Sequence, residues 1–266
     1  MISTDSGKAP LALVTGASSG IGQAFARQLA AKGYDLIVVG RREDRLQALA
    51  AEFAQNTIRP VVADLGTDAG IAALAGICAA EPLDMLVNNA GVSHYMAFTA
   101  LPADKANELL HVKVVAPTML ARAAVPGMIA RGGGTIINVA GMLAFGAAAP
   151  LGAAAGRATY VATLANLVAL SQALHEELAP QGVQVQVLCP GVVATEFHER
   201  QGMDLSALPR MSADDLVAAS LRGLALGEVI CSPGVAQPEL LTATTQADLA
   251  AFGGQSPQVA ARYLAE

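Results

Sequence analysis

Hydrophobic residues in this chain form short continuous runs, and longer amphipathic segments separate one run from the next. The runs predict buried strands at residues 11–15, 36–39, 60–63, 85–87, 135–139 and 183–188. The segments between them predict helices at residues 20–32, 42–53, 68–80, 104–130 and 159–178. Because strands and helices alternate, the pattern predicts βαβ units and therefore a parallel sheet with right-handed crossovers.

The predicted fold class is α/β, a Rossmann-type doubly wound parallel sheet in a single domain that spans residues 1–266. A chain of 266 residues fits one large α/β domain, and no repeat or interdomain linker interrupts it. A content of 53% hydrophobic and only 14% charged residues is typical of a sheet that is buried on both faces. The segment 146–156 is rich in glycine and alanine and predicts a surface loop.

Composition also argues against several classes of function. A net charge of −6, with no cluster of lysine and arginine, disfavours a nucleic-acid partner. The three cysteines are too scattered to predict a disulfide framework or a zinc site. The start of the chain lacks the apolar core of a signal peptide, and the longest charge-free stretch, 132–156, is interrupted by Asn138, Pro150 and several glycines. We therefore expect a cytoplasmic protein with no metal, no nucleic-acid partner and no membrane span.

A glycine motif follows the first predicted strand and opens the first predicted helix. Gly16 permits a tight turn, Gly20 lets the backbone approach a pyrophosphate, and Gly22 lets the helix pack closely on the strand. The helix N-terminus then presents its partial positive charge to phosphates. The motif predicts a dinucleotide site with contacts from Gly16, Ser18, Ser19, Gly20, Ile21 and Gly22.

Two arginines follow the second predicted strand, at the place where a site for NAD would carry an acidic residue. Arg41 is instead suited to the 2′-phosphate of NADP(H), with Arg42 beside it as a further predicted contact, because a guanidinium offers a phosphate a fork of donors. The alternative is a solvated pair at the start of a helix, although the helix dipole disfavours cations there. The arginines therefore favour NADP(H) as the cofactor.

Further candidate contacts follow the third and fourth predicted strands. In a doubly wound sheet both positions lie at the carboxyl edge, where the cofactor binds. Asp64 is either an adenine contact or a helix N-cap, and the sequence leaves the two alternatives equal. The predicted cofactor contacts at this edge are Asp64, Leu65, Asn89, Ala90 and Gly91.

These motifs, taken in chain order with Tyr160, Pro190-Gly191 and Thr195, resemble those of the short-chain dehydrogenase/reductase family. The resemblance extends from Leu11 to about Gly234. It implies a nicotinamide cofactor, and hydride transfer to or from a carbonyl or alcohol carbon. It also implies a homodimer or homotetramer, and a segment, 192–212, that covers the substrate. The further cofactor contacts that the resemblance implies are Tyr160, Pro190, Gly191, Val193 and Thr195.

The chain departs from the family in its catalytic residues. The family uses an asparagine, a serine, a tyrosine and a lysine, and only the tyrosine, Tyr160, is present here. The asparagine position is Lys113, the serine position is Gly141 and the lysine position is Leu164. Because Pro190-Gly191 stands at the family's spacing from Tyr160, the alignment is fixed and the departures are real.

The missing lysine defines the main mechanistic question. In the family its ammonium lowers the pKa of the tyrosine, which acts as general acid or base on the substrate oxygen. Leu164 carries no charge. Lys113 maps to a helix that faces the tyrosine in the family, so it either replaces the missing ammonium or is a solvent-facing residue beside a kink. Pro117 lacks an N–H and therefore leaves the carbonyl of Lys113 without its helical hydrogen bond.

Other side chains are candidates for the roles of the missing groups. His94 follows the Asn-Asn-Ala-Gly turn and is a candidate for the serine's role of polarising the substrate carbonyl. His111 is a second candidate, and either residue is otherwise an ordinary surface histidine. Arg157, one helical turn before Tyr160, is a weaker candidate for a source of positive charge.

Three functions fit these observations. The leading hypothesis is an NADP(H)-dependent oxidoreductase that reduces a carbonyl or imine, with Tyr160 as proton donor assisted by Lys113 and His94. Apolar residues in the covering segment, at Phe197, Met203 and Leu205, favour an apolar small-molecule substrate. The second hypothesis is an enzyme of the same fold that performs isomerisation, elimination or cyclisation without hydride transfer. The third is a non-catalytic NADP-binding protein, since a fold alone does not decide a function.

Overall fold

The structure is a computed structural model that describes residues 8–149, 156–200 and 202–264. The chain divides into two compact units, Met1–Pro233 and Gly234–Glu266. The sequence prediction places all 266 residues in one domain, whereas the sheet and its covering helices belong to the first unit alone. The predicted surface loop 146–156 lies largely outside the described residues.

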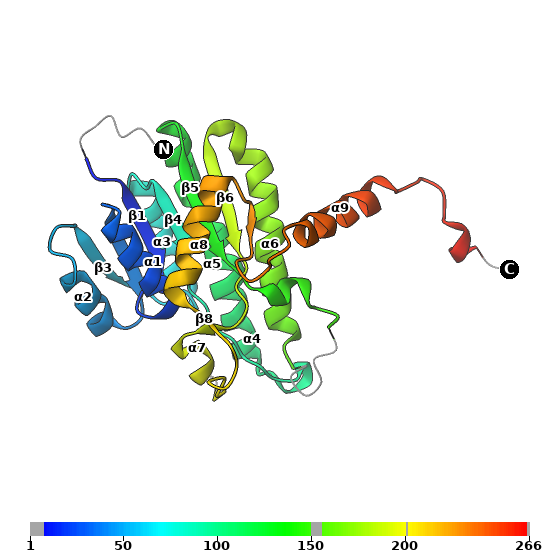
Figure 1. The fold of residues 1–266 in the computed structure, drawn as a ribbon, viewed down its shortest axis with the longest axis horizontal. Helices are drawn as coiled ribbons and strands as arrows, with labels where there is room; N and C mark the ends of the chain where they lie inside the picture. Colours follow the sequence, from blue (N-terminus) through cyan, green and yellow to red (C-terminus); the bar gives the residue numbers. More distant parts are fainter. Residues whose placement is uncertain (1–7, 150–155, 201, 265–266) are drawn as a thin grey trace. The chain divides into compact units, whose positions relative to one another are not determined.

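The first unit is built on a seven-stranded sheet in the order β3-β2-β1-β4-β5-β6-β9, and every neighbouring pair is parallel (Figure 1). This confirms the predicted Rossmann-type doubly wound sheet, with β9 as a strand that the sequence pattern missed. The strands are β1 (Leu11–Thr15), β2 (Asp35–Gly40), β3 (Ile58–Val62), β4 (Met85–Asn88), β5 (Gly134–Val139), β6 (Val183–Leu188) and β9 (Ile230–Cys231).

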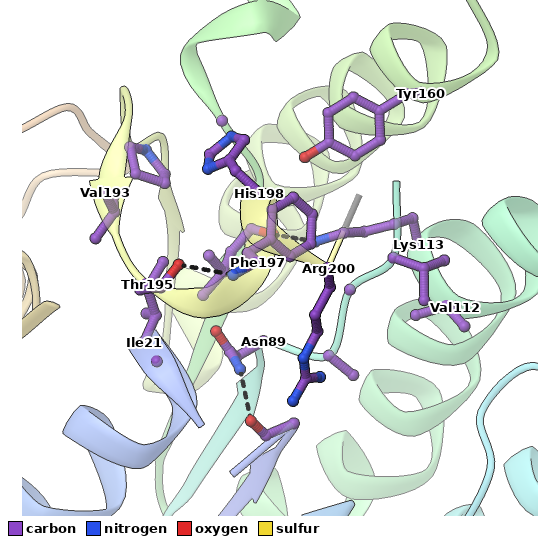
Figure 2. A pocket seen from close by; sticks show the side chains of 18 of the residues that line it. Ile21, Asn89, Val112, Lys113, Tyr160, Val193, Thr195, Phe197, His198 and Arg200 are labelled. Atoms are coloured by element: carbon purple, nitrogen blue, oxygen red, sulfur yellow. Dashed lines mark hydrogen bonds between the residues drawn. The ribbon is translucent and has the colours of Figure 1, made fainter. Parts of the chain in front are cut away.

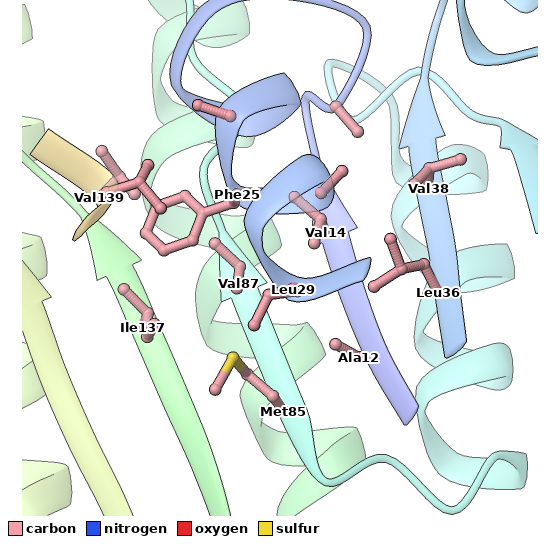
Figure 3. Packing of buried hydrophobic residues seen from close by; sticks show 14 of the residues in the cluster. Ala12, Val14, Phe25, Leu29, Leu36, Val38, Met85, Val87, Ile137 and Val139 are labelled. Carbon is pink, nitrogen blue, oxygen red and sulfur yellow. The ribbon is translucent and has the colours of Figure 1, made fainter. Parts of the chain in front are cut away.

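Helices cover both faces of this sheet (Figure 1). Successive side chains of a strand point to opposite faces, so Leu13 and Val14 of β1 enter different cores. On one face Phe25 and Leu29 of α1 pack on the strands together with α2 and α8 (Figure 3), and on the other α3 and α5 do so. The helices are α1 (Gly20–Ala31), α2 (Glu43–Ala51), α3 (Asp68–Ala80), α4 (Ala103–Leu110), α5 (Ala116–Ala130), α6 (Ala158–Leu178) and α8 (Ala213–Leu226), with 3-10 turns η1 (Phe98–Ala100), η3 (Met142–Phe145) and η5 (Ala179–Gln181).

The predicted helix at 104–130 is present, but a π-helical turn, η2 (His111–Val115), separates α4 from α5. Pro117, two residues after this turn, has no N–H to donate to the carbonyl of Lys113, which accounts for a widened turn at this point. By length and composition Ala103–Ala130 is apolar enough to cross a membrane, a test that core helices also pass. Here α5 packs against α3 and the sheet, as a core helix does.

The strand order reverses at β1, which pairs with β2 on one side and β4 on the other. Ligands of doubly wound folds bind in the crevice outside such a reversal. The register pairs Val14 with Val87 and Asn88 with Asn138. The loops that follow β1, β4 and β5 therefore begin at the same level and meet at one edge of the sheet.

The covering segment 192–212 contains a small second sheet, in which β7 (Val193–Ala194) pairs with β8 (Met211–Ser212). A short helix, α7 (Glu196–Glu199), lies between them in the sequence. The second unit consists of α9 (Glu239–Gly253) and a 3-10 turn, η6 (Ala261–Tyr263), and neither contains a buried residue.

Candidate active site

A cleft of about 1190 Å³ lies at the carboxyl edge of the sheet. Its walls come from the loops after β1 to β6, from η2 and α6, and from the covering segment 192–212. Lys113 and Tyr160 both point into it (Figure 2). Of the predicted cofactor contacts, all but Gly22 line the cleft: Gly16, Ser18, Ser19, Gly20, Ile21, Arg41, Arg42, Asp64, Leu65, Asn89, Ala90, Gly91, Tyr160, Pro190, Gly191, Val193 and Thr195.

Gly22 acts behind the cleft, where it lets α1 pack against the loop after β4. A Cβ atom at this position would collide with the side-chain nitrogen Nδ2 of Asn89 and with the carbonyl oxygen of Gly16. The same loops are tied by Thr15, whose hydroxyl accepts hydrogen bonds from the backbone amides of Asn89 (2.9 Å) and Ala90 (3.0 Å). The glycine motif and the Asn-Asn-Ala-Gly turn are thus packed and hydrogen-bonded to each other at the base of the cleft.

Substitution of Gly22 by alanine is expected to destabilise the fold by about 1–3 kcal/mol, because the added methyl group meets the backbone of Gly16 and the side-chain amide of Asn89. Gly76 is a matched control, since it is also a helical glycine but has open space around its missing side chain. Gly76→Ala is expected to be neutral or to stabilise by up to about 1 kcal/mol. Denaturant unfolding of both variants measures the difference, and equal effects would contradict the packing role.

The N-terminus of α1 and Arg42 together form an anion site. Ser19, the N-cap residue, makes no side-chain hydrogen bond to the helix, which leaves the first amides of α1 available to phosphate. The guanidinium of Arg42 donates to the hydroxyls of Ser18 (2.9 Å) and Ser19 (2.8 Å). Arg41 also lines the cleft, but it is more exposed and bonds Glu108 at 3.4 Å. Arg42 is therefore the more firmly positioned of the two predicted arginines.

One carboxylate, that of Glu196 on α7, bonds three arginines around this site. Its Oε1 accepts from Arg42 (3.0 Å) and Arg45 (2.9 Å), and from Arg200 as well. Burial acts to raise the pKa of Glu196, but hydrogen bonds from Ser19 and Arg45 and the charge of Arg42 outweigh it, and the pKa is lowered. Three guanidinium groups against one carboxylate leave a net positive charge, which favours an anionic ligand.

The structure excludes one of the two alternatives for Asp64, the helix N-cap. Thr67, not Asp64, is the N-cap of α3, and its hydroxyl accepts from the amide of Gly70 at 3.1 Å. The carboxylate of Asp64 instead accepts from the amide of Gly66 at 3.0 Å and lines the cleft with Leu65. The N-cap interpretation of Asp64 is therefore wrong.

Lys113 lies inside the protein with only 4% of its surface exposed. Its ammonium donates a hydrogen bond to the carbonyl of Val139 at 3.1 Å and lies against Gly91, where an added Cβ would come within 2.8 Å of Nζ. Burial lowers the pKa of Lys113 from its usual 10.5 to about 8. An ammonium has three donors, and the bond to Val139 uses one of them. Lys113 is thus a buried cation at the cleft wall and not a solvent-facing residue.

Tyr160 is buried on α6, and its ring meets that of Tyr95 edge-on with the centroids 5.4 Å apart and the planes at 77°. Burial raises the pKa of the Tyr160 phenol, and the charge and hydrogen bonding of Tyr95 raise it further. Tyr160 is consequently held as a neutral phenol at physiological pH, which suits it to donate a proton and not to accept one.

The predicted roles of the two histidines do not fit their positions. His94 does not line the cleft, because its Nε2 bonds the Glu108 carboxylate at 2.9 Å. His111 bonds the carbonyl of Asn107 and the carboxylate of Asp68, also away from the cleft. Neighbouring side chains of an extended segment point to opposite sides, so His94 and Tyr95 diverge and Tyr95 is the one that enters the cleft.

Gly141 and Leu164 stand side by side where the family carries its serine and lysine. A Cβ on Gly141 would lie 3.3 Å from Cδ1 of Leu164, whose side chain is 1% exposed. The leucine therefore fills space that a serine side chain would need. The two departures from the family pattern are complementary in volume.

The outer part of the cleft is largely apolar. Its walls include the predicted residues Phe197, Met203 and Leu205, together with Met142 and Leu143 of η3. Two further cleft residues were missed by sequence reasoning, Tyr95 and His198, and their rings are parallel with centroids 6.5 Å apart. Burial lowers the pKa of His198, and the charge of Arg210 lowers it further. Within 8–149, 156–200 and 202–264, no group of histidine, cysteine and carboxylate side chains is arranged to hold a metal ion.

A doubly wound parallel sheet, a glycine-lined anion site at its switch point and a tyrosine above that site define an oxidoreductase of the dinucleotide-binding class. The residues fit such a cofactor, because the backbone at Gly16 and Gly22 leaves no room for side chains and the first amides of α1 have no side-chain cap.

Comparison with known proteins agrees with this class. The model of the short chain dehydrogenase family matches residues 10–205. The chain is 30% identical over 249 residues to an uncharacterized oxidoreductase, YxjF, of Bacillus subtilis (strain 168), which covers 91% of this chain and 90% of that protein. The chain therefore belongs to the short-chain dehydrogenase/reductase family, whose members use NAD(P).

Solved structures of family members are also similar. A short-chain dehydrogenase from Sphingobium yanoikuyae in complex with NADPH has a TM-score of 0.90 at 33% identity, and the match covers 96% of this chain and 100% of that one. The bulky-bulky ketone specific alcohol dehydrogenase from Comamonas testosteroni has a TM-score of 0.86 at 31% identity, with 96% of this chain and 99% of that one covered.

Proposed function

We propose that this protein is an NADP(H)-dependent reductase of carbonyl or imine groups in apolar small molecules, with Lys113 in place of the family's missing lysine. The observation that carries the proposal is the buried ammonium of Lys113 at the wall of the cleft that Tyr160 also faces. Lys113 belongs to the turn η2, whereas the position of the missing lysine, Leu164, belongs to α6, so the cation reaches the cleft from a different element. A ketone-specific relative of similar structure supports an apolar carbonyl compound as the substrate.

The preference for NADP(H) rests on charge. The anion site of Arg42, Ser18 and Ser19 lies at the end of β2, where the family binds the adenine ribose. Glu196 bonds more than one arginine, among them Arg42 and Arg45, so this end of the cleft carries a net positive charge. A relative of similar structure binds NADPH, which is in line with this assignment.

The chain's own residues then divide the remaining work. NADPH, when bound, supplies a hydride to the substrate carbon. Tyr160 holds a proton for the substrate oxygen, since its neutral form is favoured by burial. Lys113, cationic below pH about 8, stabilises the negative charge that develops as that proton leaves. The apolar outer wall excludes water from the reacting carbon.

The direct test is stopped-flow oxidation of NADPH by the purified protein across a panel of apolar ketones, aldehydes and imines. We expect hydride transfer with at least one class, and its loss in Tyr160→Phe. Turnover of a substrate without any change in nicotinamide absorbance would indicate acid–base chemistry instead. Cofactor binding with no turnover, indifferent to Tyr160→Phe, would indicate a non-catalytic protein.

Arg42→Gln is expected to weaken the binding of NADPH by about 10- to 100-fold and to leave NADH binding nearly unchanged. The reason is the loss of charge-assisted hydrogen bonds to the 2′-phosphate, each worth about 1.5–3 kcal/mol. Fluorescence titration with both cofactors measures the ratio.

Arg45→Gln is the matched control for this experiment, since Arg45 also bonds Glu196 but does not line the cleft. It should change the ratio of NADPH to NADH affinity much less than Arg42→Gln does, because Arg45 contributes charge from outside the cleft and no contact within it. Tighter binding of NADH than of NADPH by the unmodified protein would contradict the cofactor assignment.

A further inference from the structure

Tyr95 occupies a position in the cleft that neither the family motifs nor the hypothesis above explains. It lies in the loop after β4, and this loop packs tightly against the segment that enters α6. A Cβ on Gly156 would lie 2.5 Å from the carbonyl carbon of Met96, so the missing side chain of Gly156 permits the close approach. The result is that Tyr95 stands beside Tyr160, with the ring centroids 5.4 Å apart.

The two phenol rings pack edge-on against each other, and both line the cleft. Burial raises the pKa of Tyr95, and the positive charge of Arg157 opposes part of the increase. For Tyr160 the interaction with Tyr95 acts in the other direction and adds to the effect of burial. Tyr95 therefore keeps its proton, and this neutral phenol at the wall of the cleft has an O–H group that can donate a hydrogen bond.

The proposed reaction needs a second hydrogen-bond donor to the substrate oxygen, beside Tyr160. In this family a serine polarises the substrate carbonyl, and here its position is Gly141, which has no side chain. His94 is turned away and bonded to Glu108. A carbonyl oxygen has two lone pairs and develops negative charge during reduction, so it is best held by two donors. Beside Tyr160, the geometry offers Tyr95 as the second.

We propose that Tyr95 donates a hydrogen bond to the reacting oxygen of the substrate, so that Tyr95 and Tyr160 hold this oxygen as a pair of phenols. This assignment rests on the proposed reductase function, and it names a catalytic residue that the family's set does not contain. His198, with its ring parallel to that of Tyr95, supports the phenol from the side of the covering segment.

The first measurement is the steady-state reduction of the best substrate from the carbonyl panel by Tyr95→Phe. We expect kcat to fall by about 10²-fold with little change in KM, because the bond strengthens in the transition state. The affinity for NADPH should stay the same. Tyr34→Phe, which removes a half-buried hydroxyl far from the cleft, is the matched control and should behave like the unmodified protein. An unchanged kcat in Tyr95→Phe overturns the proposal.

A second measurement does not depend on turnover. Cyclohexanecarboxamide presents a carbonyl oxygen on a carbon that does not accept hydride, and its binding to the protein saturated with NADP⁺ is measured by calorimetry. We expect Tyr95→Phe to weaken binding by about 10-fold, the equivalent of one hydrogen bond, and Tyr34→Phe to have no effect.

The two measurements separate the failure of this proposal from the failure of the proposed function. Reduction of a ketone with no effect of Tyr95→Phe in either assay leaves the reductase function in place and removes Tyr95 from it. Amide binding that depends on Tyr95, without reduction of any carbonyl compound, supports the oxygen site and contradicts the reductase. Absence of both reduction and amide binding overturns both.

Discussion

Replacing Lys113 with methionine is expected to lower kcat for carbonyl reduction by about 10²- to 10⁴-fold and, at the same time, to make the fold more stable. The rate falls because, under the proposed function, the variant loses the buried ammonium at the wall of the cleft that Tyr160 also lines. Stability rises because the pKa of Lys113 is about 8 in the fold and 10.5 when exposed, so burying its charge costs about 3 kcal/mol at neutral pH. A more stable but inactive variant excludes misfolding as the cause.

The pH dependence provides a second signature of the same residue. Lys113 is cationic below pH about 8, so the rate of the unmodified protein should fall as the pH rises through this value. The cost of burying the charge is fully present below pH about 8 and disappears as the pH approaches 10.5, so stability should increase in that window. Lys113→Met should show neither change. Lys105→Met, at an exposed position on α4, is the control, and an unchanged kcat in Lys113→Met would contradict the proposed role.

The second large effect is expected from Leu164→Lys, which restores the lysine of the family motif. We expect this variant to be less stable by about 3–5 kcal/mol and to gain no activity. The new ammonium would be buried at a position that is 1% exposed, in a cleft whose wall already carries the cation of Lys113. Thermal unfolding and NADPH oxidation measure the two effects.

Leu164→Met is the matched control, because it conserves volume without adding charge and should cost less than about 1.5 kcal/mol. Combining Leu164→Lys with Lys113→Asn and Gly141→Ser restores the whole family set and should recover both stability and activity. Higher activity in Leu164→Lys alone, with no loss of stability, would show that Lys113 does not replace the missing lysine.

Much of the fold follows from hydrophobic periodicity. The predicted strands 11–15 and 183–188 and the predicted helix 68–80 have the bounds of β1, β6 and α3. The sequence does not predict the strand β9, because its two residues are too few to show a pattern of hydrophobic and polar positions. The helix α8 was predictable in principle, since Ser212 caps it through the amide of Asp215 at 3.0 Å, three residues ahead, which is a recognisable start signal.

The cleft is less predictable than the fold, because it depends on the directions of individual side chains. Motif positions are sufficient to bring Arg41, Arg42 and Lys113 to the carboxyl edge of the sheet. They do not reveal that Arg42, and not Arg41, bonds the glycine-rich loop. Nor do they show which of His94 and Tyr95 enters the cleft, since that depends on the bond of His94 to the carboxylate of Glu108, 14 residues further along the chain.

The contact between Gly141 and Leu164 also limits how this sequence can change over time. In Gly141→Ser alone, the new Cβ would lie 3.3 Å from the side chain of Leu164. In Leu164→Lys alone, the new ammonium would be buried at a position that is 1% exposed. Each single substitution toward the family residues is therefore expected to fit less well than the present pair. The two positions are coupled, so a change at one of them is best accommodated when the other changes as well.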